Sequence, residues 1–157
     1  MSRCDYMKLN ETRTGVTPVS AWRSLLERET REVDRAGVQA AVVVIHLAAP
    51  IDLSDSSDTA DHSSALQILQ EWLRPTDRAA LTSEQDLAVL MTPTAELAET
   101  VQLVHDIDAL LAEAGFEATC SFAQRRPDEN LVTSWGRAQA ELDRALFGGI
   151  HGGCLAL

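Results

Sequence analysis

The stretch at residues 40–47 places the strongest constraint on how this chain can fold. It reads Ala-Ala-Val-Val-Val-Ile-His-Leu, and it lies between Gly37 and Pro50. A short run rich in β-branched residues favours a strand over a helix, and near-continuous apolar character is typical of a strand buried on both faces. The sequence therefore predicts a central strand here.

A helix is predicted before this strand, over residues 18–36. Its apolar residues recur with the 3.6-residue period of a helix, and Glu29 is the one charged residue within that stripe. Thr17 is predicted as the N-cap, with Pro18 as the first helical residue. Gly37 is predicted to end the helix, because glycine readily adopts the left-handed conformation found there.

The remainder of the chain alternates between helices and strands. Residues 49–59 contain Pro, Ser and Asp and are predicted as a loop, and residues 61–73 as a second helix that ends before Pro75. The later predicted elements are hairpin strands at 78–82 and 86–92, a third helix announced by Thr92, Pro93 and Glu96 that ends before Gly115, a strand at 116–123, and a helix at 132–147. This order predicts an α+β fold with a ferredoxin-like βαββαβ core, in which helices flank a mainly antiparallel sheet.

Charge and length limit the classes of function. The chain has 157 residues and a net charge of -11, from 24 acidic and 13 basic residues. That balance repels polyanions, so we expect no nucleic-acid partner. No apolar run approaches the roughly 20 residues of a membrane helix, and three cysteines without CxxC spacing favour free thiols. We expect a cytoplasmic protein without a membrane partner.

Three segments resemble motifs of GGDEF domains, the fold of diguanylate cyclases. Residues 14–22, Thr-Gly-Val-Thr-Pro-Val-Ser-Ala-Trp, are similar to the entry of the first family helix, and residues 145–147, Ala-Leu-Phe, to its closing helix. Residues 76–90 are similar to the hairpin that carries the family's glycine-glycine-acid-acid-aromatic turn. The resemblance implies a GGDEF-like palm over residues 14–150, with a flexible segment at 1–13 and a tail at 151–157.

The residues that carry catalysis in that family are replaced in this chain. The resemblance assigns two magnesium ions to acids at the end of the central strand and in the turn, where this chain has His46 and Gln85. Ala48 replaces another family acid, and Ser83 and Glu84 replace the two turn glycines. We therefore expect a degenerate domain that is not an enzyme, with no catalytic residue, metal or cofactor. A generic palm domain that never had this site predicts the same inactivity.

One ligand site of the family has a counterpart. Arg74-Pro75-Thr76-Asp77 ends shortly before the turn, where the family has an inhibitory Arg-x-x-Asp that binds cyclic di-GMP. An arginine fork suits guanine or phosphate, and a carboxylate accepts from guanine N–H groups. Arg78 could add positive charge near this ligand site, and His105 occupies the position of a second family arginine. Alternatively, Arg74 satisfies the end of the preceding helix and Asp77 caps a turn.

Other polar residues receive structural interpretations. His46 and His62 flank an acidic loop at 52–61, but their spacing matches no metal motif, so a histidine at a strand end beside a solvated loop is favoured. Asp86 is interpreted as a solvated turn residue without a role. The three tryptophans are predicted to pack on apolar helix faces.

Two functional hypotheses follow from these observations. The first is a non-catalytic GGDEF-like regulatory protein that binds cyclic di-GMP through Arg74 and Asp77. The second is a scaffold that binds a protein partner, or a second copy of itself, without any nucleotide. Ligand binding would separate them, because a ligand that binds the folded state stabilises it.

Overall fold

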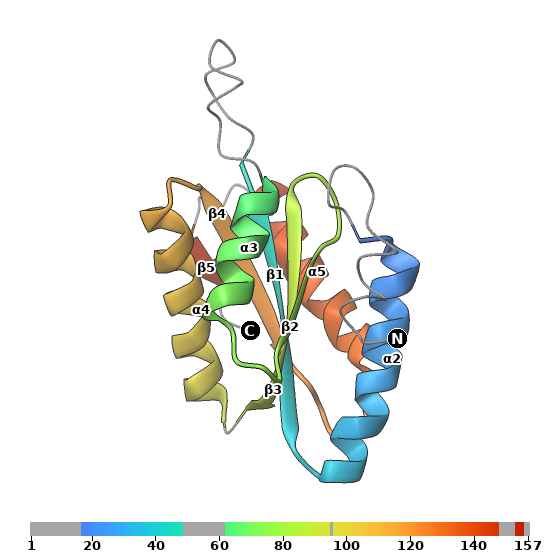
Figure 1. The fold of residues 1–157 in the computed structure, drawn as a ribbon. Coiled ribbons are helices and arrows are strands. Elements are labelled where there is room, and N and C mark those ends of the chain that lie inside the picture. Colours follow the sequence, from blue (N-terminus) through green and yellow to red (C-terminus); the bar gives the residue numbers. More distant parts are fainter. Residues whose placement is uncertain (1–16, 49–61, 95, 148–152, 156–157) are drawn as a thin grey trace.

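The computed structural model describes residues 17–48, 62–94, 96–147 and 153–155 (Figure 1). The elements in chain order are α2 (Val19–Ala36), β1 (Gln39–Leu47), α3 (His62–Trp72), β2 (Arg78–Leu81), β3 (Asp86–Thr94), α4 (Leu97–Glu113), β4 (Ala118–Gln124), α5 (Leu131–Phe147) and β5 (Gly153–Leu155). Figure 1 shows α3 and α4 in front of the sheet, with α2 and α5 on its other side.

The sheet has the strand order β2-β3-β1-β4-β5. Strands β2, β3, β1 and β4 pair antiparallel with their neighbours, while β5 pairs parallel with β4. The predicted α+β class, with helices flanking a mainly antiparallel sheet, is confirmed. Strand β1 lies at the centre of the sheet. The last residue pair between β1 and β3, next to the turn that precedes β3, places His46 opposite Asp86.

Strand β1 is buried on both faces, as its apolar sequence predicts. Val43 and Ile45 belong to the core beneath α3 and α4, which also contains Leu69. Val42 belongs to a second core cluster beneath α2, around Trp22. Alternate residues of a strand point to opposite faces, so an unbroken apolar run can supply two cores at once.

Two predicted helix starts are wrong. Pro18 is the N-cap of α2 and makes no side-chain cap bond, whereas the Thr17 amide donates to the carbonyl of Leu81 in β2. Strand β3 continues through the predicted helix start as far as Thr94, which pairs with Gln39. In both places a backbone bond to a strand distant in sequence replaces the local capping signal.

Two further features are absent from the sequence predictions. Residues 153–155, within the predicted tail, form strand β5 beside β4. Trp72 is 37% exposed, so the prediction that every tryptophan is packed is wrong for this residue. Periodicity shows on which helix face a residue lies, but it does not show whether another element covers that face.

No helix within the described segments is both long enough and apolar enough to cross a membrane.

Candidate functional site

The turn between β2 and β3 is closed by its own side chains. Ser83 Oγ donates to Asp86 Oδ2 at 2.6 Å, and the Gln85 amide donates to Ser83 Oγ at 3.2 Å. His46 Nδ1 lies 2.9 Å from Asp86 Oδ1 across the sheet. Asp86 is therefore a bonded member of the turn, which corrects its interpretation as a solvated residue without a role.

Gln85 joins this turn to the end of β1. Its carbonyl accepts the Leu47 amide at 2.7 Å, and its Nε2 donates to the Leu47 carbonyl at 3.2 Å. The amide side chain thus continues the backbone pairing one step beyond His46 and Asp86. The position that the family resemblance assigns to an acidic metal ligand holds a neutral amide engaged in the sheet.

Arg74 and Asp77 bind each other in the loop between α3 and β2. Arg74 Nε donates to Asp77 Oδ2 and Arg74 Nη2 to Asp77 Oδ1, each at 3.0 Å, which is the bidentate geometry of a strong charged pair. Hydrogen bonding to Asp77 raises the pKa of the Arg74 guanidinium, burial opposes this, and the charges of Asp77 and Glu99 add to it. Arg74 Nη2 also donates to the carbonyl of Pro93 at 3.0 Å.

The Asp77 carboxylate is occupied and buried. Besides the two bonds from the guanidinium, it accepts the backbone amides of Arg74 and Thr92, each at 3.1 Å. Its side chain is 1% exposed, whereas that of Arg74 is 41% exposed. In this conformation Asp77 presents no accepting oxygen to a ligand, and Arg74 presents only part of its guanidinium.

Of the other two predicted ligand residues, Arg78 bonds only the backbone of this loop, and His105 does not join the pair. Arg78 Nη1 donates to the carbonyls of Pro75 and Asp77, at 2.7 and 2.9 Å. His105 is exposed on α4 and takes no part in the bonds of Arg74 and Asp77. The structure thus brings Arg74 and Asp77 together and leaves His105 outside their contact.

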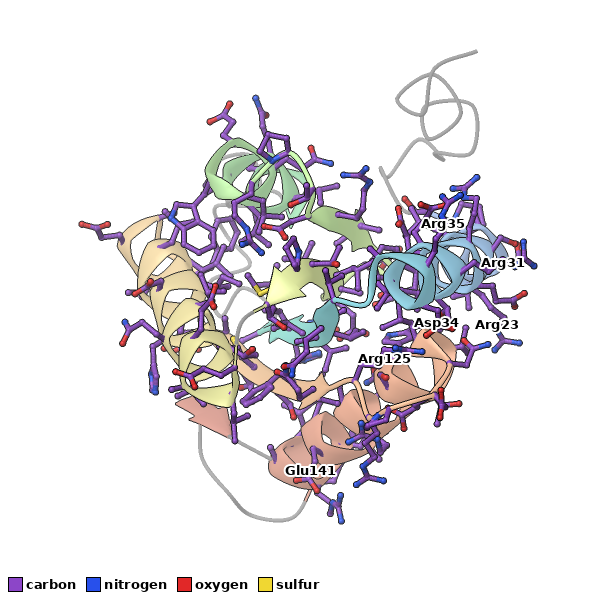
Figure 2. The ribbon with its side chains drawn as sticks, turned by 90° about the horizontal axis from the view of Figure 1, so that it is seen from below. Arg23, Arg31, Asp34, Arg35, Arg125 and Glu141 are labelled. Carbon is purple, nitrogen blue, oxygen red and sulfur yellow. The ribbon has the colours of Figure 1, made fainter. Side chains whose placement is uncertain are left out.

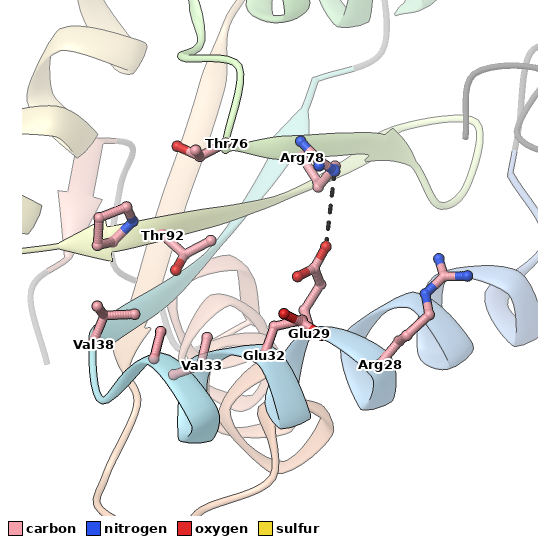
Figure 3. Close-up of a pocket in the computed structure, with 10 residues that line it drawn as sticks. Arg28, Glu29, Glu32, Val33, Val38, Thr76, Arg78 and Thr92 are labelled. Atoms are coloured by element: carbon pink, nitrogen blue, oxygen red, sulfur yellow. Dashed lines mark ion pairs between the residues drawn. The ribbon is translucent and has the colours of Figure 1, made fainter. Parts of the chain in front are cut away.

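A pocket of about 370 Å³ lies between α2 and the ends of β2 and β3 (Figure 3). Glu29 and Arg78 face each other in it, with Glu29 Oε1 3.9 Å from Arg78 Nε. Glu29 is the charged residue within the apolar stripe of the first helix, and its ion pair with Arg78 offsets part of the cost of burying it. The pocket has balanced charge and lies on the α2 side of the hairpin.

No group of three or more potential metal-ligating residues occurs within the described ranges. The acidic loop at 52–61, which the sequence placed beside His46 and His62, lies outside the described residues. His46 itself is directed to Asp86. The metal interpretation of these histidines therefore has no support from the described part of the chain.

Comparison with known proteins gives a consistent result for the fold. No family model matches the chain, and no curated protein sequence matches it. Solved structures do match. The GGDEF domain of DgcB from Caulobacter crescentus, in complex with c-di-GMP, superposes with a TM-score of 0.70 over 94% of this chain and 95% of that chain, at 17% identity. The fold is that of a GGDEF domain.

Two further GGDEF structures agree. A microbial GGDEF domain in a novel interaction mode with cyclic di-GMP has a TM-score of 0.74 at 15% identity, covering 97% of this chain and 99% of that chain. The diguanylate cyclase SiaD of Pseudomonas aeruginosa, in complex with its activator SiaC, has a TM-score of 0.75 at 13% identity, over 98% of this chain and 64% of that chain. At such identities the likeness concerns the fold alone.

Sequence reasoning missed two contacts of this GGDEF-like site. The pairing of His46 with Asp86 follows from strand register, because each stands opposite the other across β1 and β3. Pairing the second strand of the predicted hairpin with the predicted central strand could have revealed that His46 and Asp86 are neighbours. The bond from Arg74 to the Pro93 carbonyl has no local signal, since the two residues meet only after the sheet has formed.

Proposed function

We propose that this chain is a GGDEF-like regulatory protein that does not synthesise cyclic di-GMP and acts by binding another protein. The observation that carries the proposal is the closed turn between β2 and β3. Ser83, Gln85 and Asp86 bond to one another, to His46 and to β1, at the place where the family resemblance assigns metal ligands and an open glycine turn.

The donor set at this turn does not fit a pair of magnesium ions. Magnesium in nucleotide sites prefers carboxylate oxygens together with phosphate oxygens and water. At the two positions that the resemblance assigns to acidic metal ligands, Gln85 supplies an amide and His46 supplies a ring nitrogen. Asp86 supplies a carboxylate, but both of its oxygens are already bonded. Side chains at positions 83 and 84 also limit how closely a phosphate can approach the backbone.

The absence of cyclase activity can be tested directly. We expect no cyclic di-GMP when the pure protein is incubated with GTP and magnesium, because His46 and Gln85 stand where the resemblance assigns acidic magnesium ligands, and the side chains at positions 83 and 84 limit access of the triphosphate to the backbone. Chromatography of the reaction mixture measures the product, with a competent diguanylate cyclase as positive control. Product that forms at a rate proportional to the concentration of this protein would contradict the proposal.

Binding of cyclic di-GMP is the second candidate function. It is motivated by the Arg74–Asp77 pair and by the DgcB structure, which contains c-di-GMP. The geometry supports it less well, because a guanine that used Asp77 would have to displace four hydrogen bonds from a carboxylate that is 1% exposed. A role for the pair in holding the fold together requires no such rearrangement.

We therefore expect calorimetric titration with cyclic di-GMP to give no saturable heat. If heat does appear, Arg74→Lys and Arg144→Lys distinguish its origin. Both variants keep the charge and lose the guanidinium fork, but Arg144 lies in the last turn of α5. Saturable binding that Arg74→Lys abolishes and Arg144→Lys leaves intact would establish the cyclic di-GMP receptor function. It would contradict the proposal that the chain acts by binding another protein without a nucleotide.

A further inference from the structure

Among the four long helices of the described segments, arginine occurs on α2 and α5 and is absent from α3 and α4. No lysine or arginine occurs between Arg35 and Arg74, or between Arg78 and Arg125, so α3 and α4 contain neither. Figure 2 shows the labelled arginines of α2, together with Arg125, on the side of α2 and α5 and away from α4.

The layer formed by α3 and α4 is correspondingly acidic. The acids in these helices and at the start of α4 are Glu71, Glu96, Glu99, Asp106, Asp108 and Glu113. On α2, by contrast, acids alternate with arginines, and pairs such as Arg35 with Glu32 form along the helix. The two outer faces of the domain therefore differ in charge, and the negative potential is concentrated over α3 and α4.

Two large apolar side chains are exposed at one end of this acidic layer. Trp72, in the last turn of α3, is 37% exposed, and Leu97, the first residue of α4, is 48% exposed. The bond from Arg74 to the Pro93 carbonyl holds the end of α3 near the start of α4. Trp72 and Leu97 consequently lie at the same end of the layer.

Arg74, the basic residue at the end of the layer that carries Trp72 and Leu97, does not offset the negative charge of the acidic layer. The guanidinium of Arg74 is held by Asp77, so this pair has no net charge. An exposed tryptophan at the end of an acidic layer is typical of an interface, because aromatic side chains supply much of the binding free energy and charges on the same face select the partner.

We propose that the outer face of α3 and α4 is a docking surface for a lysine- or arginine-rich amphipathic helix of another protein, with Trp72 and Leu97 as its apolar anchors. The proposal deepens the partner-binding part of the proposed function and rests on it. Nucleic acid is disfavoured because phosphate would meet carboxylates on this face. A second copy is disfavoured because each copy has a net charge of -11.

The probe is a synthetic amphipathic helical peptide with leucine on one face and lysine on the other. Fluorescence anisotropy of the labelled peptide measures binding to the full chain without any nucleotide, and a peptide with glutamate in place of lysine is the reference. We expect the lysine peptide to bind, with affinity that falls as salt is added, and the glutamate peptide not to bind. Equal binding of both peptides would overturn the proposal.

Two sets of variants locate the binding face. The first set neutralises three exposed acids of α3 and α4: Glu71→Gln, Asp106→Asn and Glu113→Gln. The second makes the same chemical changes on α2 and α5: Glu27→Gln, Asp143→Asn and Glu141→Gln. Asp106 and Asp143 match closely, since each accepts from a glutamine four residues earlier.

We expect the first set to weaken binding of the lysine peptide by about fivefold or more and the second by less than about twofold. Equal weakening would mean that binding follows net charge alone, which would overturn the proposal. Trp72→Ala should weaken binding by about tenfold, whereas Phe147→Ala, at an exposed residue of α5, should not. Unchanged binding in Trp72→Ala would also overturn it.

Sedimentation velocity tests whether a second copy of this chain, and not another protein, occupies the docking surface. Dimerisation of the unmodified chain that Trp72→Ala abolishes would assign this face to a second copy and overturn the proposal. Circular dichroism and thermal unfolding confirm that each variant is folded before binding is measured. Because no step uses GTP, failure of the docking test would leave the cyclase result unaffected, and the two proposals can fail separately.

Discussion

Replacement of Asp77 by alanine is expected to lower the free energy of unfolding by about 3 kcal/mol. The substitution removes an acceptor of four hydrogen bonds from a site that is 1% exposed. It leaves the Thr92 amide and the Arg74 guanidinium without this partner. Because four donors lose an acceptor that is buried, the effect should exceed that of an ordinary surface change. Urea unfolding measures the change.

A matched ion pair provides the control. Glu32 pairs with Arg35 at the same i,i+3 spacing, and both side chains are more than half exposed, so Glu32→Ala removes a carboxylate from an arginine pair without creating a buried defect. We expect it to lower the free energy of unfolding much less than Asp77→Ala does. Similar losses for Asp77→Ala and Glu32→Ala would contradict a structural role for the Arg74–Asp77 pair.

A double-mutant cycle on Arg74 and Asp77 separates their interaction from other effects of the substitutions. The double variant should be more stable than the sum of the single losses predicts, by about 1 to 3 kcal/mol, because each single variant already breaks the shared fork. Additive losses would show that the two side chains stabilise the protein independently.

Acid should selectively weaken the contact between the end of β4 and α5, through Glu129. Glu129 Oε1 accepts from Arg137 Nη2 at 2.7 Å and from Ser134 Oγ at 2.7 Å, and Oε2 accepts from Arg137 Nε at 2.9 Å. Arg137 Nη2 also donates to the carbonyl of Gln124 in β4. Burial alone would raise the pKa of Glu129, but hydrogen bonds from Arg137, Ser134 and the Arg126 amide lower it to about 2.

The direction of the pH effect follows from this lowered pKa. The ordinary value of 4.5 applies to the unfolded chain, so the folded protein holds the carboxylate ionised over a range in which the unfolded chain takes up a proton. The stabilisation is fully present above about pH 4.5 and is lost as the pH falls towards about 2. We expect the ionised Glu129 to contribute about 2 kcal/mol to the free energy of unfolding. This is less than the pKa shift alone implies, because solvent screens the partly exposed Arg137.

Urea unfolding at successive pH values between 5 and 3 measures this effect. Glu129→Gln should be less stable than the unmodified chain at pH 5, and the difference should shrink as the solution is acidified. Glu113→Gln is a suitable control, since Glu113 is exposed at the end of α4 and its variant should follow the unmodified chain. A constant difference between Glu129→Gln and the unmodified chain at every pH would contradict the assignment.

The sequence alone determined the order and type of most elements. The apolar run at 40–47 predicts the central strand, and periodic apolar residues predict the helices, because a period of two or of 3.6 residues is a local property of the chain. The order of these elements then predicts the antiparallel sheet. The segments that resemble GGDEF motifs predict a fold that the structural comparisons support.

The sequence also placed Arg74 and Asp77 in one loop, but it could not show how they are used. The two alternatives, a ligand site and a structural turn, differ only in whether other parts of the chain occupy the carboxylate. In the structure the Thr92 amide donates to the carboxylate and the Pro93 carbonyl accepts from Arg74, and both belong to the strand after the turn. Hydrogen bonds between residues distant in sequence leave no periodic trace.

The same reason explains the other features that only the tertiary structure decided. His46 acquires Asp86 as a partner because strand register sets them opposite each other, and β3 continues to Thr94 because Gln39 pairs with it. Trp72 stays exposed because the described elements leave part of it uncovered. Local sequence thus determined the helices, the strands and their order, whereas pairing and coverage, which depend on distant segments meeting, determined the chemistry available at each surface.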